Sequence, residues 1–274
     1  MRIWVVCALA VSFGCGDDPA IVIPDAAIDA PPPPPDAFVP PDARIANLAC
    51  NNDPIETVAT DPVNITGNTV SLSPVTGITA VADATIEVRD FADPDGTPLE
   101  TATSDVNGDY AIALATGTVA ADVFLRVTAA NLLPTEEFSP TVLTADQMVP
   151  AVLFDAQTIG LLAQFTGQSQ DLGTNGLAVV LMVDCDQQPI EAATVVTPPG
   201  VGGVVYAGAD GLPDSSLDRT STSGTAFVFD VPPAADVVFD AEVMGMSLRD
   251  NHVRIEAGTV AAVVVAPGTP PPTL

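Results

Sequence analysis

The stretch "TATSDVNGDYAIAL" (Thr101–Leu114) reads as a strand, a tight turn and a second strand, and it decides the class of fold. The turn falls at Asp105–Gly108, where Gly108 permits a positive φ and Asn107 tolerates one. Apolar and polar residues alternate along the strand that follows, which is typical of a half-buried β-strand. The stretch therefore predicts a β-hairpin within an all-β region.

Similar patterns lie on both sides of this hairpin. The segments "ATIEVRD" (Ala84–Asp90) and "DVFLRVTA" (Asp122–Ala129) alternate in the same way, and "DPDG" (Asp93–Gly96) is a turn. Short alternating runs separated by Gly, Pro, Asp and Asn are typical of strands and their turns. We therefore expect a first β module that ends near residue 140.

A second set of strand patterns runs from residue 176 to residue 267. It opens with the apolar "LAVVLMVD" (Leu177–Asp184), which we expect to be a long buried strand, and it closes with "GTVAAVVVAP" (Gly258–Pro267). Between them, "TSTSGTAFVFDV" (Thr220–Val231) repeats the first hairpin: a threonine, a glycine turn and an alternating strand. The segment "ADATIEV" (Ala82–Val88) likewise matches "EAATVV" (Glu191–Val196). The sequence therefore predicts two copies of one β module.

The repeated segments resemble the carboxypeptidase regulatory-like, or transthyretin-like, β-sandwich family. "PIEAATV" (Pro189–Val195) matches the first half of the family pattern, and "TSDVNGDY" (Thr103–Tyr110) matches the second half. The resemblance implies a mainly β chain with two Greek-key β-sandwich modules of transthyretin-like or immunoglobulin-like type. It also implies a non-catalytic role as a spacer, a binding accessory or a stabiliser.

Residues 141–175, between the two modules, show a different periodicity. The safest helix is Asp155–Thr166, with Asp155 or Thr144 as candidate caps and Gly167 as its stop. Pro150 interrupts the earlier half of the pattern. We therefore expect a short helical segment to join module 1 (50–140) to module 2 (176–267), with a flexible tail at 268–274. The apolar positions on helical spacings are Val149, Val152, Leu153, Ala156, Ile159 and Leu162.

Residues 1–14 read as a signal peptide. Arg2 supplies a positive charge, and the apolar Ile3–Phe13 is shorter than the about 20 residues that span a bilayer. The segment then resembles the lipobox of bacterial lipoproteins, in which the peptidase cuts before a cysteine that carries acyl chains such as palmitate. The resemblance makes Cys15 the predicted lipidation site, although Ser12 and Phe13 depart from the usual residues. An ordinary signal peptide cut nearby is the alternative.

The predicted mature chain begins with a Pro/Ala/Asp-rich linker over residues 15–49. This segment has few large apolar groups, so we expect it to be disordered. Its run Pro31–Pro35 favours polyproline II, which would hold a domain roughly 60–80 Å from the membrane. We therefore expect an extracytoplasmic protein of the bacterial cell envelope, facing the periplasm or the cell surface. The choice between inner and outer membrane stays open.

Charge and aromatic content exclude some partners. The chain has 35 acidic and 7 basic residues, all of the latter arginine, which gives a net charge of −28. Nucleic-acid binding requires clustered lysine or arginine, so we expect no nucleic-acid partner. Aromatic residues make up only 5% of the chain, which disfavours a surface that stacks on sugars or bases.

Few residues suggest chemistry. His252 is the only histidine, and no G-x-S-x-G motif occurs, so a hydrolase is an unfavoured alternative and we expect no enzyme. No cofactor is expected, except that two acidic turns offer oxygen ligands of the kind that Ca²⁺ prefers. Ordinary turn chemistry explains the same residues and is the favoured interpretation. The weak Ca²⁺ candidates are Asp90, Asp93, Asp95, Asp105, Asn107 and Asp109.

Cys50 and Cys185 remain after the leader and the lipidation site are set aside. An even number of cysteines in an oxidising compartment favours a disulfide between them. Two separate thiols, one of them buried, are the alternative.

These patterns together predict a non-enzymatic lipoprotein with a structural role or a role in binding an envelope protein or a glycan. The alternatives are a carbohydrate-dependent or Ca²⁺-dependent adhesion module and, less favoured, a hydrolase. The lipid anchor would make the membrane a partner. The sequence leaves the ligand and the oligomeric state open.

Overall fold

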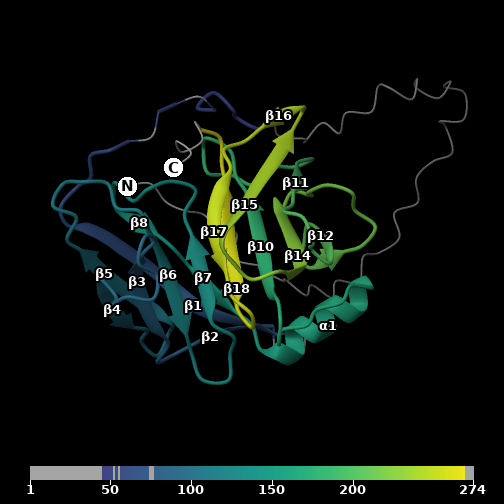
Figure 1. The fold of residues 1–274 in the computed structure, drawn as a ribbon, viewed down its shortest axis with the longest axis horizontal. Helices are drawn as coiled ribbons and strands as arrows, with labels where there is room; N and C mark the ends of the chain where they lie inside the picture. The colour runs from purple at the N-terminus through teal and green to yellow at the C-terminus, as the bar shows by residue number, and fades with distance from the viewer. Residues whose placement is uncertain (1–44, 52, 55, 74–76, 269–274) are drawn as a thin grey trace, which may run out of the picture.

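The computed structural model describes residues 45–51, 53–54, 56–73 and 77–268. Within these residues the regular secondary structure is β-strand apart from one helix (Figure 1). The mainly β fold class and the sandwich architecture predicted from the sequence are confirmed. The predicted signal peptide, Cys15, most of the predicted linker and most of the predicted tail lie outside the described residues.

The strands form three sheets. The five-stranded sheet contains β1 (Val63–Ser73), β2 (Gly77–Ala80), β5 (Asp109–Leu114), β8 (Gln147–Met148) and β9 (Ala151–Leu153). The nine-stranded sheet contains, in spatial order, β13 (Pro213–Asp214), β12 (Gly203–Ala207), β14 (Thr225–Val231), β10 (Gly176–Met182), β18 (Val260–Val265), β7 (Thr135–Phe138), β6 (Val123–Thr128), β3 (Thr85–Asp90) and β4 (Glu100–Thr103). The four-stranded sheet contains β11 (Thr194–Val196), β15 (Ala234–Val243), β16 (Met246–Ser247) and β17 (Asn251–Ile255).

The two smaller sheets pack on opposite faces of the nine-stranded sheet. Strand β6 shows this directly, because successive side chains of a strand point to opposite faces. Leu125 and Val127 belong to the core that β1 and β5 complete, whereas Phe124 belongs to the core that β15 and β17 complete. From here on, module 1 means β1–β9, which includes two strands from the predicted connector, and module 2 means β10–β18. Each module is thus a sandwich that contributes strands to the shared sheet.

A parallel strand pair fuses the two modules. Strand β18 of module 2 pairs with β7 of module 1, with Ala262 opposite Glu137, and β18 pairs on its other edge with β10. The predicted connector 141–175 also contributes strands, because β8 and β9 pair in parallel with β1. The helical spacing of Val149, Val152 and Leu153 was therefore misleading: Pro150 separates two short strands there. The two modules are joined by a continuous sheet as well as by the connector.

The helix of the connector is α1 (Ala156–Thr166), close to the predicted Asp155–Thr166. Asp155 caps it by accepting a hydrogen bond from the Thr158 N–H at 2.7 Å, and Gly167 ends it in the left-handed conformation. Its buried face, which includes Ile159 and Leu162, packs on one end of β10 and β14. Among the described residues no helix is long and apolar enough to cross a membrane.

The repeated sequence segments make the same hydrogen bonds in both modules. In module 1 the Ser104 hydroxyl accepts from the Ala84 N–H at 2.9 Å and donates to the Val81 carbonyl at 2.8 Å. In module 2 the Thr220 hydroxyl bridges the Ala193 N–H and the Ile190 carbonyl at 2.8 and 2.7 Å. We call this arrangement the hydroxyl clip.

Candidate functional site

The centre of the nine-stranded sheet is apolar on both faces. Along β10 and β18, Ala178, Val180, Met182, Ala261, Val263 and Val265 are buried in the core of module 2. The alternate residues point the other way, and Val179, Leu181, Ala262 and Val264 are only half-buried. Strands that are apolar on both faces are normally covered on both faces, so a partly uncovered apolar face is informative.

An open groove lies over this second face. Module 1's smaller sheet and α1 cover parts of the same face, and between them remains a cavity of about 430 Å³. We call it the β10–β18 groove. Its volume falls within the about 300–1,000 Å³ typical of small-molecule sites. The walls include Leu72 and Phe154 on one side, and Phe227, Thr225 and the loop residue Asp210 on the other.

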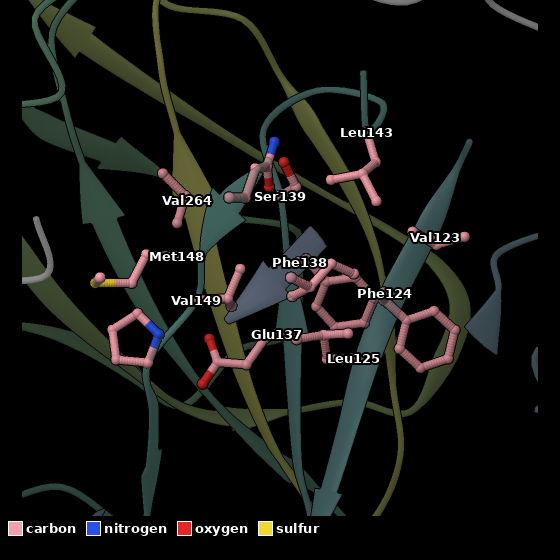
Figure 2. Close-up of a pocket in the computed structure, with 13 residues that line it drawn as sticks. Val123, Phe124, Leu125, Glu137, Phe138, Ser139, Leu143, Met148, Val149 and Val264 are labelled. Carbon is pink, nitrogen blue, oxygen red and sulfur yellow. The ribbon is translucent and has the colours of Figure 1, made fainter. Parts of the chain in front are cut away.

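Glu137 lies at the module 1 edge of the groove. It is paired with Ala262 on β18 and with Leu125 on β6, so its side chain points to the groove face. Glu137 also lines an adjoining pocket of about 50 Å³, where Figure 2 shows its carboxyl pointing away from Leu125, toward the side on which Val149 and Met148 lie. Glu137, Pro150 and Val264 line both cavities.

The surroundings of the Glu137 carboxyl are poor in compensating charge. Burial raises the pKa of Glu137 to about 8, and a hydrogen bond from the Val152 backbone lowers it only in part. None of the described residues that line either cavity is basic. The groove therefore combines a large apolar surface with the Glu137 carboxyl group, which forms no ion pair with any described residue.

The neighbouring Glu136 has the opposite environment. It points to the other face of the sheet, where the Arg126 Nε donates to its Oε1 at 2.9 Å. Burial raises the pKa of Glu136, and the bond from Arg126 opposes this rise. Arg126 also pairs with Glu256, which pairs in turn with Arg254. This ion-pair chain joins the modules on the face away from the groove.

The first predicted Ca²⁺ turn takes part in that chain. Both Asp95 oxygens accept hydrogen bonds from Arg254, at 2.9 and 3.2 Å, and this bond holds the pKa of Asp95 below its usual range. Asp90 accepts from the Ala92 N–H at 2.9 Å, and Asp93 closes a backbone turn with Gly96. Asp95, one of the three predicted Ca²⁺ ligands in this turn, is therefore already paired with Arg254.

The second predicted Ca²⁺ turn links β4 to β5. The turn forms as predicted, but the β-hairpin does not, because β4 pairs with β3 in the nine-stranded sheet and β5 pairs with β1 in the five-stranded sheet. Asp105 Oδ1 accepts from the backbone N–H groups of Asn107 and Asp109, at 2.8 and 3.0 Å. Within the described part of the chain, no three His, Cys, Asp or Glu residues are grouped so that they could hold a metal ion. Ca²⁺ binding stays a prediction without a ligand cluster to carry it.

His252 lies on β17, half-exposed, in the sheet away from the groove. Its Nδ1 is 2.8 Å from Asp236 Oδ1, and its Nε2 is 3.9 Å from Asp250 Oδ2. The structure thus places carboxylates on both sides of the ring. This arrangement differs from the serine–histidine–acid geometry of a hydrolase, in which the second ring nitrogen faces a hydroxyl.

Cys50 and Cys185 are joined in a disulfide, with the Cα atoms 5.8 Å apart. Nearby, the Cys185 N–H donates to the Asn47 carbonyl at 2.9 Å, and the Asn47 N–H donates to Asp184 at 3.0 Å. The first described residues are therefore fastened to module 2, before the chain enters module 1. Cys15 lies outside the described residues.

Sequence reasoning missed Glu137. The signal was available in "TEEF" (Thr135–Phe138), where two adjacent glutamates occupy one strand and must point to opposite faces of the sheet. On one face Arg126 pairs with Glu136. On the other face Glu137 lies beside the apolar strands "GLAVVLM" and "VAAVVV". A carboxyl on an apolar face is costly to bury, which marks it as a candidate functional group.

Comparison with known proteins does not show to which family the chain belongs. No family model matches the chain, and no curated protein matches it. Among solved structures, the TIE protein of Bacillus anthracis aligns at 13% identity over 74% of this chain with a TM-score of 0.25, and this chain spans 34% of its length. A minor pilin of Streptococcus agalactiae aligns at 11% identity over 77% of this chain and 98% of the pilin, with a TM-score of 0.24.

A third structure is a type II cohesin–X-dockerin complex from Acetivibrio cellulolyticus. It aligns at 20% identity over 34% of this chain and 58% of that chain, with a TM-score of 0.26. Likenesses at this level carry no argument about this protein. The site must be interpreted from its own geometry.

Proposed function

We propose that this chain is a non-enzymatic lipoprotein of the bacterial cell envelope that binds an apolar ligand in the β10–β18 groove. Acylation of Cys15 would anchor it to the membrane, and residues 15–49 would act as the spacer. The observation that carries the binding role is the groove itself. It leaves Val179, Leu181, Ala262 and Val264 half-buried along the middle of the largest sheet.

The composition of the groove favours binding over catalysis. Thr222, Ser223 and Thr225 bring hydroxyl groups to one rim, and Asp210 lies beside them. A hydroxyl nucleophile needs an adjacent base such as histidine or lysine to activate it. No residue of either type is among the described residues that line the groove. The groove therefore supplies shape and apolar contact, with few groups that could carry out a reaction.

The disulfide supports the proposed location. Disulfides persist in oxidising compartments such as the periplasm and the cell surface, and they are rare in the cytosol. The Cys50–Cys185 bond is therefore in keeping with an exported protein. It also fastens the segment that follows the predicted spacer to module 2.

Binding can be tested with an uncharged fluorescent apolar probe such as N-phenyl-1-naphthylamine. We expect wild-type protein to enhance the fluorescence, and we expect Ala262→Phe to abolish the effect because the new ring fills the groove beside Glu137. The matched control is Ala113→Phe, at an exposed position of β5. Loss of signal in both variants, or no signal in the wild type, would contradict the binding role.

The anchor needs a separate experiment. A Cys15→Ala variant, expressed with its leader in a bacterial host, should move from the membrane fraction to the soluble fraction. A variant that stays in the membrane fraction would show that Cys15 is not the anchor.

A further inference from the structure

We propose that the β10–β18 groove selects an apolar cation, an amine or quaternary ammonium on an alkyl or aryl group, and that the Glu137 carboxylate pairs with its charge. This inference rests on the proposed binding function and names the class of its ligand.

The strand pairing places Glu137 in a row of side chains that continues along the groove. From Glu137 on β7 the row runs through Ala262 on β18 and Val179 on β10 to Phe227 on β14, and all four residues line the groove. Ala262 is the smallest side chain in the row and stands directly beside Glu137. The groove is therefore open next to the carboxyl and apolar beyond it, which matches a ligand with one polar end and a long apolar part.

The charged residues of the groove favour a ligand whose polar end is positively charged. Glu137 and Asp210 are the acidic residues that line the groove, and its described lining contains no basic residue. The whole chain carries a net charge of −28, which repels anions and attracts cations at longer range. An anionic apolar ligand would meet only like charges. A cationic ligand would meet a carboxylate in a site of low dielectric, where an ion pair is strong.

Glu136 shows what Glu137 lacks. Both residues are on β7, where Glu136 is fully buried and Glu137 is half-buried. Glu136 receives the Arg126 guanidinium at 2.9 Å, whereas no described residue forms an ion pair with Glu137. A bound ammonium group would compensate the charge of the Glu137 carboxylate, as the Arg126 guanidinium compensates that of Glu136.

The protonation of Glu137 gives the binding a characteristic dependence on pH. With a pKa of about 8, the carboxyl of the empty protein is mostly protonated at pH 7, so the cation must displace a proton. Affinity should therefore rise as pH increases toward 8 and level off above it. The other titratable groups nearby are Asp210 in the groove wall and Tyr110, whose hydroxyl donates to the Val149 carbonyl. Strands β9, β10 and β18 contribute no titratable side chain.

Three ligands with one tail and different heads test the proposal: decyltrimethylammonium, decanol and decanoate. Each is titrated into the folded full-length mature protein by calorimetry at pH 6.0, 7.0 and 8.5, below its micelle concentration. We expect decyltrimethylammonium to bind at least about tenfold more tightly than decanol at pH 8.5, and decanoate to bind most weakly. The cation's affinity should fall about tenfold per pH unit well below pH 8, while that of decanol stays constant.

Variants assign the effect to Glu137. Glu137→Gln should reduce the preference for the cation to less than about threefold and remove its pH dependence, with decanol binding unchanged. Asp210→Asn is the matched control and should retain most of the preference, because Asp210 is exposed at the rim. Circular dichroism checks that each variant is folded. If Glu137→Gln does not fold, the pH series on the wild type still decides, because decanol has no charge to titrate.

The outcomes separate the ligand class from the binding function. Equal binding of decanol and the cation, a preference for decanoate, or an unchanged preference in Glu137→Gln would overturn the apolar-cation proposal while the groove remained a binding site. Failure of all three ligands and of the fluorescent probe to bind would overturn the binding function itself.

Discussion

The central strands of the two modules, β1 and β10, have matching inner contacts and opposite outer faces. The N–H of Thr69 on β1 donates to the Gly108 carbonyl at 2.8 Å, and the N–H of Met182 on β10 donates to the Gly224 carbonyl at 2.8 Å. Each strand also pairs in parallel with the last strand of its module. These bonds, with the hydroxyl clip, fix how each sandwich is closed.

The outer faces of the same strands differ. Aligned on Thr69 and Met182, the outer residues of β1 are the exposed Asn64, Thr66 and Asn68, and those of β10 are Leu177, Val179 and Leu181. The repeated fold does not require apolar residues on the outer face of this strand, because the outer residues of β1 in module 1 are polar. The comparison shows that the apolar outer face of module 2 is an addition to the fold, and this is the face that forms the groove.

The largest effect should come from the disulfide, which treats the modules unequally. It closes a loop with a sequence separation of 135 that contains all of module 1. Replacing both cysteines by serine should lower the free energy of unfolding by about 5 kcal/mol, because the unfolded chain gains the freedom of the open loop. Urea unfolding of the oxidised wild type and the double variant measures the change. A loss below about 1 kcal/mol would contradict the chain-entropy argument.

The turn glycines should behave alike in the two modules. Gly108 and Gly224 have positive φ, and an added Cβ would lie 2.4 Å from the Thr69 carbonyl oxygen and 2.7 Å from that of Met182. Changing either glycine to alanine should cost about 3 kcal/mol, through backbone strain and the close contact. Gly245→Ala has a similar φ and open space around it, so it should cost about 1 kcal/mol. Thermal unfolding measures the loss of stability in each variant. A clearly smaller loss for one of the two glycines would contradict the expected equivalence of the modules.

The effect of pH should be confined to the groove face. Because the folded-state pKa of Glu137 is raised to about 8, the unfolded chain releases its proton at lower pH than the folded chain does. This group therefore lowers the free energy of unfolding as pH rises from about 4.5 to about 8. Glu137→Gln should flatten that part of the pH profile and be most stabilising at its upper end. If the free energy of unfolding, measured by chemical denaturation, depends on pH in the same way in Glu137→Gln as in the wild type, then the Glu137 carboxyl is exposed to water.

The smallest effect on stability should come from giving β10 the outer face of β1. Val179→Thr combined with Leu181→Asn introduces the residues that β1 carries at the aligned positions, Thr66 and Asn68. We expect a loss of about 1 kcal/mol, because both side chains are only half-buried. We also expect apolar probe binding to disappear. Unchanged probe fluorescence would mean that the groove does not bind through this face.

Local signals in the sequence predicted much of this fold. The Asp155 cap and the Gly167 stop delimited α1 because both act within a few residues of the helix ends. The turn at Asp105–Gly108 was equally local. The pairing of β7 with β18 was not predictable, because a parallel pair between distant strands leaves no short-range pattern. Glu137 became a candidate only through that pairing, which places Ala262 and the apolar outer face of β10 beside it.

The Cys50–Cys185 bond also decides how the molecule would respond to mechanical tension. A pull between residues 45 and 268 would travel along the backbone to Cys50, cross the disulfide to Cys185 and continue to the end of β18. Residues 51–184 lie inside the covalent loop, so module 1 and β10 would carry no direct force through their backbone. Unfolding under tension would have to begin in the rest of module 2. The two repeats, so alike in their bonding, would thus differ in mechanical exposure: one is shielded, and the other is in line with the force.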